Sequence, residues 1–265
     1  KDHQSEPIES ASETLQRIFD GHGSVLGSQM ADESSRYDVL KKTDFPKPQR
    51  TRRIAVANQK GGVGKTTSTV NTAAALANKG AQVLVIDMDP QGNASTALGV
   101  SHSSGEPSVY DVIEGRSDLG DVITVCPDFP TLDVVPASID LSGAELEVAD
   151  LPNRNTLLKE ALDLYLRQSD KHYDYVFIDC PPSLGLLVIN AMCAVTEMLI
   201  PIQAEYYALE GLGQLINTIG LVQEHFNPVL LVSTMLVTMF DRRTLLSREV
   251  YNEVKGPVSY THLRA

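Results

Sequence analysis

The sequence Lys-Gly-Gly-Val-Gly-Lys-Thr-Thr at residues 60–67 decides the fold. It follows the apolar run 54–57 and precedes a helix-like segment at 66–78, so the local order is strand, glycine loop, helix. Glycines let the backbone turn tightly with its N–H groups pointing inward, and the helix N-terminus adds the positive end of its dipole. A loop of this kind is suited to holding phosphate.

Two side chains of this loop suit a nucleotide. Lys65 brings a positive charge for the β- and γ-phosphates, and Thr66 brings a hydroxyl for Mg²⁺. The strict P-loop pattern G-x-x-x-x-G-K-[ST] requires glycine where this chain has Gln59, so the match fails at one position. A second lysine, Lys60, opens the loop instead. The strand and helix around the loop favour a phosphate site over a chance glycine-rich turn.

Length and composition restrict the class of protein. A chain of 265 residues with 42% hydrophobic content suits one large α/β domain plus extensions. Its three cysteines lack C-x-x-C spacing, which favours a reducing cytoplasm over a zinc site or a disulfide framework. A net charge of −12 disfavours DNA binding by the whole surface but leaves room for a local basic patch. The sequence contains no run of 18 apolar residues, so we expect a soluble protein, and we expect no membrane partner.

Two further predicted strands end in carboxylates. Residues 82–87 form a continuous apolar run typical of a buried parallel strand, with Asp87 and Asp89 at its end. Residues 173–179 form a second such strand that ends in Asp179. Functional groups of open α/β sheets gather at the carboxyl ends of strands, so we expect these carboxylates beside the glycine loop. Taken alone, aspartates after a strand would more often be turn or helix-capping residues.

The rest of the pattern predicts further α/β elements. We expect helices at 109–114, 140–149 and 155–168, and strands at 132–136, 197–203 and 229–238.

The loop resembles the deviant Walker A loop of the ParA/MinD family of ATPases. In that family the extra lysine, here Lys60, reaches across a dimer interface to the partner's nucleotide. The resemblance runs from about residue 53 to residue 255 and includes the D-x-D-P-Q-G run that begins at Asp87 and the D-x-P-P-S-L-G run that begins at Asp179. It implies a P-loop NTPase fold, with a mostly parallel central sheet flanked by helices.

The resemblance also implies roles for individual residues. ATP would be bound by Lys60, Gly61, Gly62, Val63, Gly64, Lys65, Thr66 and Thr67. The catalytic residues would be Lys60, Lys65 and Asp89, of which Asp89 orients the hydrolytic water in the first switch. Residues 180–185 resemble the second switch, which moves with the γ-phosphate.

Metal and base contacts follow from the same resemblance. Asp179 would hold Mg²⁺ through water, Thr66 would bind it, and Asp87 would assist the metal shell. Asp241 is a candidate for the surroundings of the nucleotide base, with a solvated loop residue as an equal alternative. The guanine-selecting N-K-x-D motif is absent from the sequence, so ATP is favoured over GTP.

The match to ParA- and Soj-type proteins implies a partition ATPase. Such a protein forms a homodimer across Lys60 when ATP is bound, binds non-specific DNA, and is reset by a ParB-like partner. It would be cytoplasmic and nucleoid-associated and would segregate chromosome or plasmid DNA. Alternatives are a MinD-like membrane-cycling ATPase and a nucleotide-binding fragment that does not cycle. An electron-transfer ATPase like nitrogenase iron protein is disfavoured by the cysteine spacing.

Both ends of the chain differ from this family pattern. Residues 1–49 are rich in Ser, Glu, Asp and Gly and predict a flexible extension, followed by the ATPase domain at 50–255. Residues 256–265 do not resemble the family, so we expect a foreign tail on a domain truncated at its C-terminus.

Overall fold

The computed structural model describes residues 34–36, 39, 42–43, 45–205, 208–241 and 243–255. The chain divides into two units, Lys1–Pro46 and Lys47–Ala265. Most of the extension predicted at 1–49 and all of the tail predicted at 256–265 lie outside the described residues. The second unit begins at Lys47, whose ammonium lies 3.2 Å from the carboxylate of Asp174.

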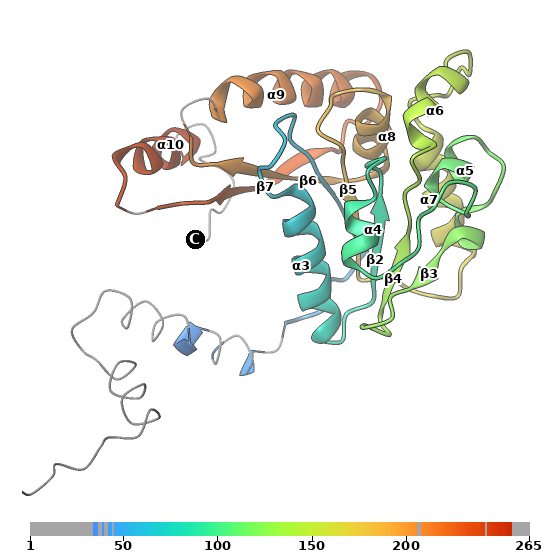
Figure 1. Ribbon diagram of the computed structural model, residues 1–265, viewed down its shortest axis with the longest axis horizontal. Helices are drawn as coiled ribbons and strands as arrows, with labels where there is room; N and C mark the ends of the chain where they lie inside the picture. The colour runs from blue at the N-terminus through green and yellow to red at the C-terminus, as the bar shows by residue number, and fades with distance from the viewer. Residues whose placement is uncertain are drawn as a thin grey trace, which may run out of the picture. The chain divides into compact units, whose positions relative to one another are not determined.

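A seven-stranded sheet in the order β3-β4-β2-β5-β1-β6-β7 forms the second unit (Figure 1). Its strands are β1 (Arg52–Val56), β2 (Val83–Asp87), β3 (Thr124–Val125), β4 (Leu132–Val135), β5 (Tyr175–Asp179), β6 (Glu197–Gln203) and β7 (Leu231–Thr238). All neighbouring strands are parallel except β3 and β4, which are antiparallel. The predicted α/β fold with a mostly parallel sheet is therefore confirmed.

Helices cover both faces of the sheet (Figure 1). They are α3 (Lys65–Asn78), α4 (Asn93–Ala97), α5 (Val109–Ile113), the 3-10 helix η1 (Leu119–Val122), α6 (Leu141–Glu147), α7 (Leu157–Gln168), α8 (Leu186–Ala194), α9 (Ala208–His225) and α10 (Leu245–Lys255). The helices predicted at 109–114, 140–149 and 155–168 correspond to α5, α6 and α7. No helix among the described residues is long and apolar enough to cross a bilayer.

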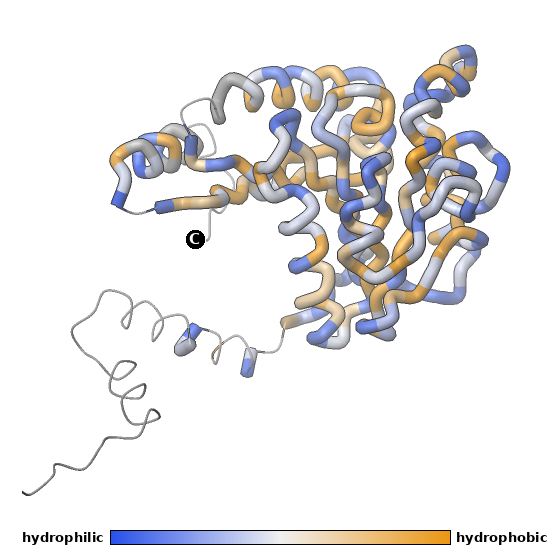
Figure 2. Tube along the Cα trace, viewed as in Figure 1, coloured by the Kyte–Doolittle hydropathy of each residue, from blue (hydrophilic) through white to orange (hydrophobic). Residues whose placement is uncertain are grey.

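Alternate residues of each central strand face opposite layers of the core. In β1, Ile54 and Val56 belong to the cluster that includes α3, while Ala55 belongs to the cluster that includes α7 and α8. Figure 2 shows the resulting apolar runs in the strands. Burial of each such large apolar side chain contributes about 1.5–3 kcal/mol, so both faces hold the strands in one register. This register aligns the carboxyl ends of β1, β2 and β5.

Candidate nucleotide site

The glycine loop lies at the centre of the sheet. Strand β1 pairs with β5 on one side and β6 on the other, and Val56 is in register with both Asp179 and Leu199. The chain then turns through the loop into α3, which begins at Lys65. Gly64 precedes α3 with a φ of 89°, a left-handed conformation that a side chain would strain. The loop thus directs the backbone N–H groups of the first turn of α3 toward its interior.

Side-chain hydrogen bonds fix the loop to the neighbouring strands. The Asn58 amide nitrogen donates to the carbonyl of Pro201 in β6 at 2.7 Å, and its oxygen accepts from the backbone N–H of Lys60 at 3.0 Å. The Thr238 hydroxyl, at the end of β7, donates to the Val63 carbonyl at 2.9 Å. The loop is therefore held in shape before any nucleotide arrives, which lowers the ordering cost of binding.

The two lysines of the loop lie in different surroundings. Lys65 is 7% exposed, and its ammonium donates to the carbonyl of Lys60 at 3.1 Å. Burial lowers the pKa of the Lys65 ammonium, and the negative charges of Asp179 and Asp89 oppose this change. The side chain of Lys60 is 35% exposed, and its ammonium lies 2.5 Å from the carboxylate of Glu205. Lys65 is thus placed for phosphate inside the loop, while Lys60 lies at its outer edge.

Asp179 is one of two fully buried acidic groups of the site, with Asp87. It has no exposed surface and accepts hydrogen bonds from the hydroxyls of Thr66 at 2.7 Å and Thr69 at 3.0 Å. Burial raises the pKa of Asp179 to about 7, with smaller contributions from the negative charges of Asp87 and Asp89. A buried carboxylate next to a threonine hydroxyl at a phosphate loop suits a hard, oxygen-seeking cation.

Asp87 is in register with Asp179 on the next strand, but its carboxylate is directed elsewhere. One oxygen accepts from the backbone N–H and hydroxyl of Ser95, at 2.8 and 2.7 Å, and the other from the backbone N–H of Asp89 at 3.2 Å. The Ser95 hydroxyl in turn accepts from the N–H of Ala137 at 3.1 Å. Burial raises the pKa of Asp87. Asp87 therefore links the segment after β2 to α4 through these hydrogen bonds. Its negative charge also acts on Asp179.

Asp89 begins the turn between β2 and α4. It is 7% exposed, and one of its oxygens accepts from the N–H of Gln91 at 3.0 Å. Its backbone carbonyl accepts from the N–H of Gly92 at 2.9 Å, which closes the turn. The carboxylate is thus fixed by its own turn, next to the charges of Lys65 and Asp179.

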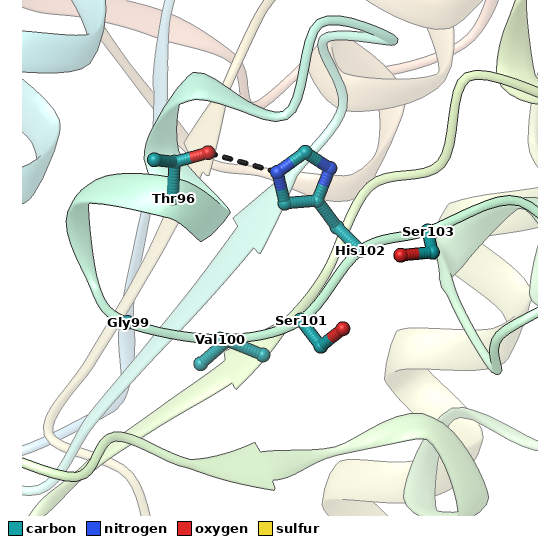
Figure 3. A pocket seen from close by; sticks show the side chains of 6 residues that line it. All are labelled: Thr96, Gly99, Val100, Ser101, His102 and Ser103. Carbon is teal, nitrogen blue, oxygen red and sulfur yellow. Dashed lines mark hydrogen bonds between the residues drawn. The ribbon is translucent and has the colours of Figure 1, made fainter.

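The turn that carries Asp89 packs against a histidine. Gly92 precedes α4 with a φ of 63°, and the imidazole of His102 lies over it while bonding to the Thr96 hydroxyl at 2.8 Å (Figure 3). Beside them is a pocket of about 380 Å³ lined by Thr96, Gly99, Val100, Ser101, His102 and Ser103. A side chain at Gly92 would place its Cβ 2.4 Å from the His102 ring. Gly92 is thus required by both the backbone conformation and the close approach.

We expect Gly92→Ala to destabilise the protein by about 2–4 kcal/mol, because it combines left-handed strain with displacement of His102. Gly115→Ala is the matched control: Gly115 has a φ of 72°, but a Cβ there would meet nothing within 4 Å. The control should be destabilised only by the left-handed strain, which costs about 1–2 kcal/mol. Thermal unfolding of both variants measures the difference, and equal losses would show that the His102 contact contributes nothing.

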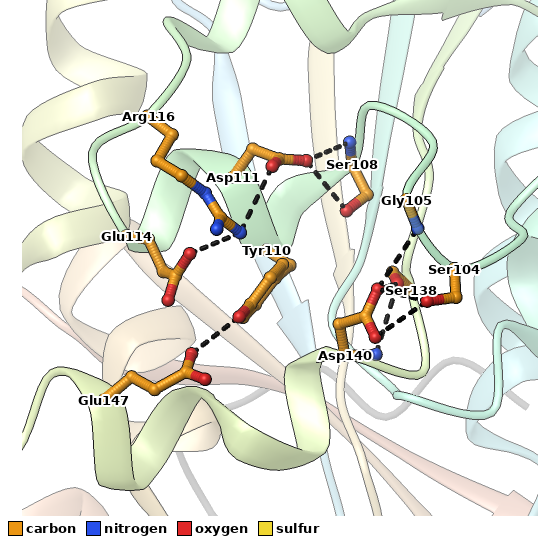
Figure 4. Close-up of polar contacts among 10 residues, drawn as sticks. All are labelled: Ser104, Gly105, Ser108, Tyr110, Asp111, Glu114, Arg116, Ser138, Asp140 and Glu147. Atoms are coloured by element: carbon orange, nitrogen blue, oxygen red, sulfur yellow. Dashed lines mark hydrogen bonds and ion pairs between the residues drawn. The ribbon is translucent and has the colours of Figure 1, made fainter.

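Residues 180–185 lead into α8, whose first turn is anchored by α6. The N–H of Leu186 donates to the Glu145 carboxylate at 2.7 Å, and the Asn190 amide bonds to the carbonyl of Arg154 at 2.7 Å. Helix α6 is itself fixed by a polar cluster (Figure 4), in which Tyr110 donates to Glu147 and Asp140 accepts from the hydroxyls of Ser104 and Ser138. The segment that resembles the second switch therefore rests on the layer formed by α5 and α6.

Asp241 follows β7, whose end bonds to the glycine loop through Thr238. Its carboxylate pairs with the guanidinium of Arg243 at 2.8 Å, and this hydrogen bond lowers the pKa of Asp241 to about 2. The structure thus places Asp241 in an exposed ion pair on the loop after β7. Its assignment to the base surroundings stays a prediction.

Some residues of the site were not predicted from the sequence. Asn58 and Glu205 bond to Lys60. Thr69 bonds to Asp179, and Ser95 bonds to Asp87. Thr69 follows Thr66 by three residues on a predicted helix, and that spacing places both hydroxyls on one face. Glu205 follows the strand predicted at 197–203, and no local pattern links it to Lys60.

Comparisons with known proteins agree with this arrangement. The model of an AAA domain family matches residues 51–232. The sporulation initiation inhibitor protein Soj of Bacillus subtilis is 50% identical over 202 residues, which cover 76% of this chain and 78% of that protein. The chromosome partitioning protein ParA of Caulobacter vibrioides is 46% identical over 203 residues, covering 77% and 75% of the two chains.

A solved structure adds ligands to the comparison. It is named cobyrinic acid a,c-diamide synthase from Mycobacterium smegmatis and holds ADP and magnesium. It is 40% identical to this chain with a TM-score of 0.71, and the alignment covers 77% of this chain and 81% of that one. Curated relatives of higher identity include proteins named for chromosome partitioning, from Caulobacter vibrioides, Myxococcus xanthus and Treponema pallidum. The chain therefore belongs to the ParA/Soj family of chromosome-partitioning ATPases.

Proposed function

We propose that the chain is a Mg²⁺-dependent ATPase that uses ATP as a switch for pairing and for binding DNA. One observation carries this proposal: Lys65, Thr66, Asp89 and Asp179, from three separate strand ends, converge around one glycine loop. A loop that served only as a turn would not require two buried carboxylates and a buried lysine beside it, since each buried charge is costly.

The residues present fit MgATP. Gly62 and Gly64 adopt the positive φ values that a tight loop around phosphate requires. Among the described residues, the Lys65 ammonium donates to a backbone carbonyl of the same loop. Within the described part of the chain, the buried side-chain oxygen of Gln59 has no hydrogen-bond partner, which leaves one acceptor for a ligand, water or partner chain. We assign phosphate binding to residues 60–67, and metal binding to the Thr66 hydroxyl and, through water, to Asp179.

Each residue has a defined task in hydrolysis. Lys65 neutralises phosphate charge, and Asp89 holds the attacking water in line and accepts its proton. When bound, Mg²⁺ would neutralise charge on the phosphate oxygens. Asp87 keeps the turn of Asp89 in place through Ser95 and adds negative charge behind the metal shell. Asp241 lies on a loop tied to the glycine loop and would border the base.

Pairing and DNA binding complete the proposed cycle. Lys60 would reach the nucleotide of a second copy, so that the ATP-bound form is a homodimer. This dimer would bind DNA without sequence preference and be reset by a ParB-like partner, and the proposal is consistent with a relative named for chromosome partitioning. The site of action would be the nucleoid in the cytoplasm. The physical basis is a two-state equilibrium that ATP shifts because it contacts the paired state better.

We expect the chain to bind non-specific duplex DNA in the presence of ATP and Mg²⁺, with affinity that falls as salt rises, because phosphate contacts release counterions. Lys60→Ala should abolish this binding and the pairing while leaving nucleotide binding nearly intact. Fluorescence anisotropy of a labelled duplex at low and moderate salt measures DNA binding, and nucleotide titration measures nucleotide binding. Binding to anionic vesicles in place of DNA would favour a MinD-like function, and wild-type hydrolysis by Lys60→Ala would refute a role for Lys60 in trans.

A further inference from the structure

Lys60 is engaged within its own chain. Its ammonium lies 2.5 Å from the carboxylate of Glu205, which follows β6 by two residues. The backbone around Glu205 is held by the end of the sheet, since the N–H of Ala204 donates to the Thr238 carbonyl at 3.1 Å and that of Glu205 to the Gln203 carbonyl at 2.8 Å. The partner of Lys60 is thus presented from a fixed strand end.

The rest of Lys60 is fixed as well. Its N–H donates to the Asn58 side chain at 3.0 Å, and its carbonyl accepts from the Lys65 ammonium at 3.1 Å. The Lys60 side chain can therefore change partner without any change in the backbone of the loop. The cost of this movement is the loss of one ion pair between groups that are 35% and 45% exposed.

We propose that Glu205 is a positioning residue that holds Lys60 in cis while the chain is unpaired and releases it when two copies pair. The Lys60–Glu205 pair is then a latch on the residue that acts across the interface. This inference rests on the proposed function, because it requires that Lys60 acts in trans. It adds a regulatory element to the same site: the latch lowers the fraction of chains ready to pair.

The size of the effect follows from population arithmetic. An exposed ion pair shifts a conformational equilibrium by about 1.4- to 5-fold. A dimer requires release in both copies, so the apparent dissociation constant scales with the inverse square of the released fraction. Removing the latch should therefore lower the dissociation constant of the dimer by about 2- to 25-fold. Salt screens exposed pairs, so this gain should shrink at high ionic strength.

The test is Glu205→Gln, which keeps the shape of the side chain and removes its charge. We expect tighter ATP-dependent dimerisation in sedimentation experiments with a non-hydrolysable ATP analogue and Mg²⁺, at low salt more than at high salt. Glu224→Gln is the matched control, because Glu224 is 70% exposed on α9. It removes the same charge and should leave dimerisation unchanged.

A second measurement uses the unaltered chain. A carbodiimide joins an ammonium and a carboxylate only when they are in contact, so the nucleotide-free protein should yield a peptide linked between Lys60 and Glu205. The ATP analogue with Mg²⁺ should reduce its yield. This experiment decides the question even where Glu205→Gln fails to fold, because absence of the linked peptide would overturn the latch.

The outcomes separate the two proposals. A wild-type chain that binds nucleotide but stays monomeric would overturn the proposed pairing, and the latch with it. Normal pairing by the wild type together with weaker pairing by Glu205→Gln would place Glu205 at the interface and overturn the latch alone. An unchanged dimerisation constant in Glu205→Gln would overturn it as well.

Discussion

Asp89→Asn is expected to lower ATP hydrolysis by about 10²- to 10⁴-fold, because it removes the group that would accept a proton from the attacking water. The change keeps the shape of the side chain, and the N–H of Gln91 still finds an oxygen to donate to. Nucleotide binding should persist, since the proposal assigns the phosphates to the glycine loop and Lys65. The variant should therefore accumulate in the ATP-bound, paired form. Multiple-turnover phosphate release and sedimentation measure the two effects.

The control for Asp89→Asn is Asp118→Asn, which removes a carboxylate from an exposed residue at the start of η1. It should hydrolyse ATP at the wild-type rate. Loss of nucleotide binding in Asp89→Asn would assign Asp89 to binding and contradict a role limited to hydrolysis. If Asp89→Asn and the wild type hydrolyse ATP at equal rates, Asp89 does not act as the base for the attacking water. Its role would then be limited to the turn after β2.

The parts of the site that could be predicted from the sequence are contiguous segments. Residues 60–67 carry the loop, the lysine and the hydroxyl in one run, and the carboxylates stand directly after apolar strands. The parallel sheet then brings the strand ends together by a general rule, so Asp89 and Asp179 could be placed beside the loop without coordinates. The hydrogen bonds of these two carboxylates could not be predicted, because they depend on the directions of the side chains.

The remaining features depend on contacts over long sequence distances. Lys60 and Glu205 are 145 residues apart, and no local pattern links them. Helix α8 was not predicted because seven of its nine residues are buried, so it lacks the one-sided apolar stripe that identifies a surface helix. The two-residue strand β3 is too short for a period of two to appear. The bonds of Asp87 to Ser95 could not be predicted either, because they depend on the packing of α4, and its place in the metal shell stays a prediction.

Asp179→Asn is expected to have opposite effects on stability and on metal binding. In the folded chain Asp179 has a pKa of about 7, above its ordinary value of 3.8, because burial disfavours the charged form. The folded chain therefore binds more protons than the unfolded chain between pH 4 and pH 7, and its stability falls as the pH rises through this range. Above pH 7 the penalty reaches on the order of 4 kcal/mol.

Asparagine does not titrate, so the variant should escape this penalty. In the absence of nucleotide and Mg²⁺, we expect its free energy of unfolding to exceed that of the wild type by a margin that widens between pH 4 and pH 7 and is constant above. Its affinity for Mg²⁺ with nucleotide should fall, on the order of 10- to 100-fold, because the carboxylate proposed to orient the metal's water is lost. Urea unfolding from pH 5 to pH 8 and calorimetric titration measure the two quantities.

Asp163→Asn is a control of opposite sign. The pKa of Asp163 lies below its ordinary value despite the opposing effect of burial, because Arg53 and Lys159 stabilise its charged form. A lowered pKa contributes stability above the unfolded pKa that is lost as the pH falls, so this variant should be less stable than the wild type at pH 8 and approach it in acid. A loss of stability at pH 8 in both variants would show that the Asp179 charge is compensated within the fold. A gain in Asp179→Asn alone would show that the site keeps an unfavourable buried charge, whose cost a bound cation can offset.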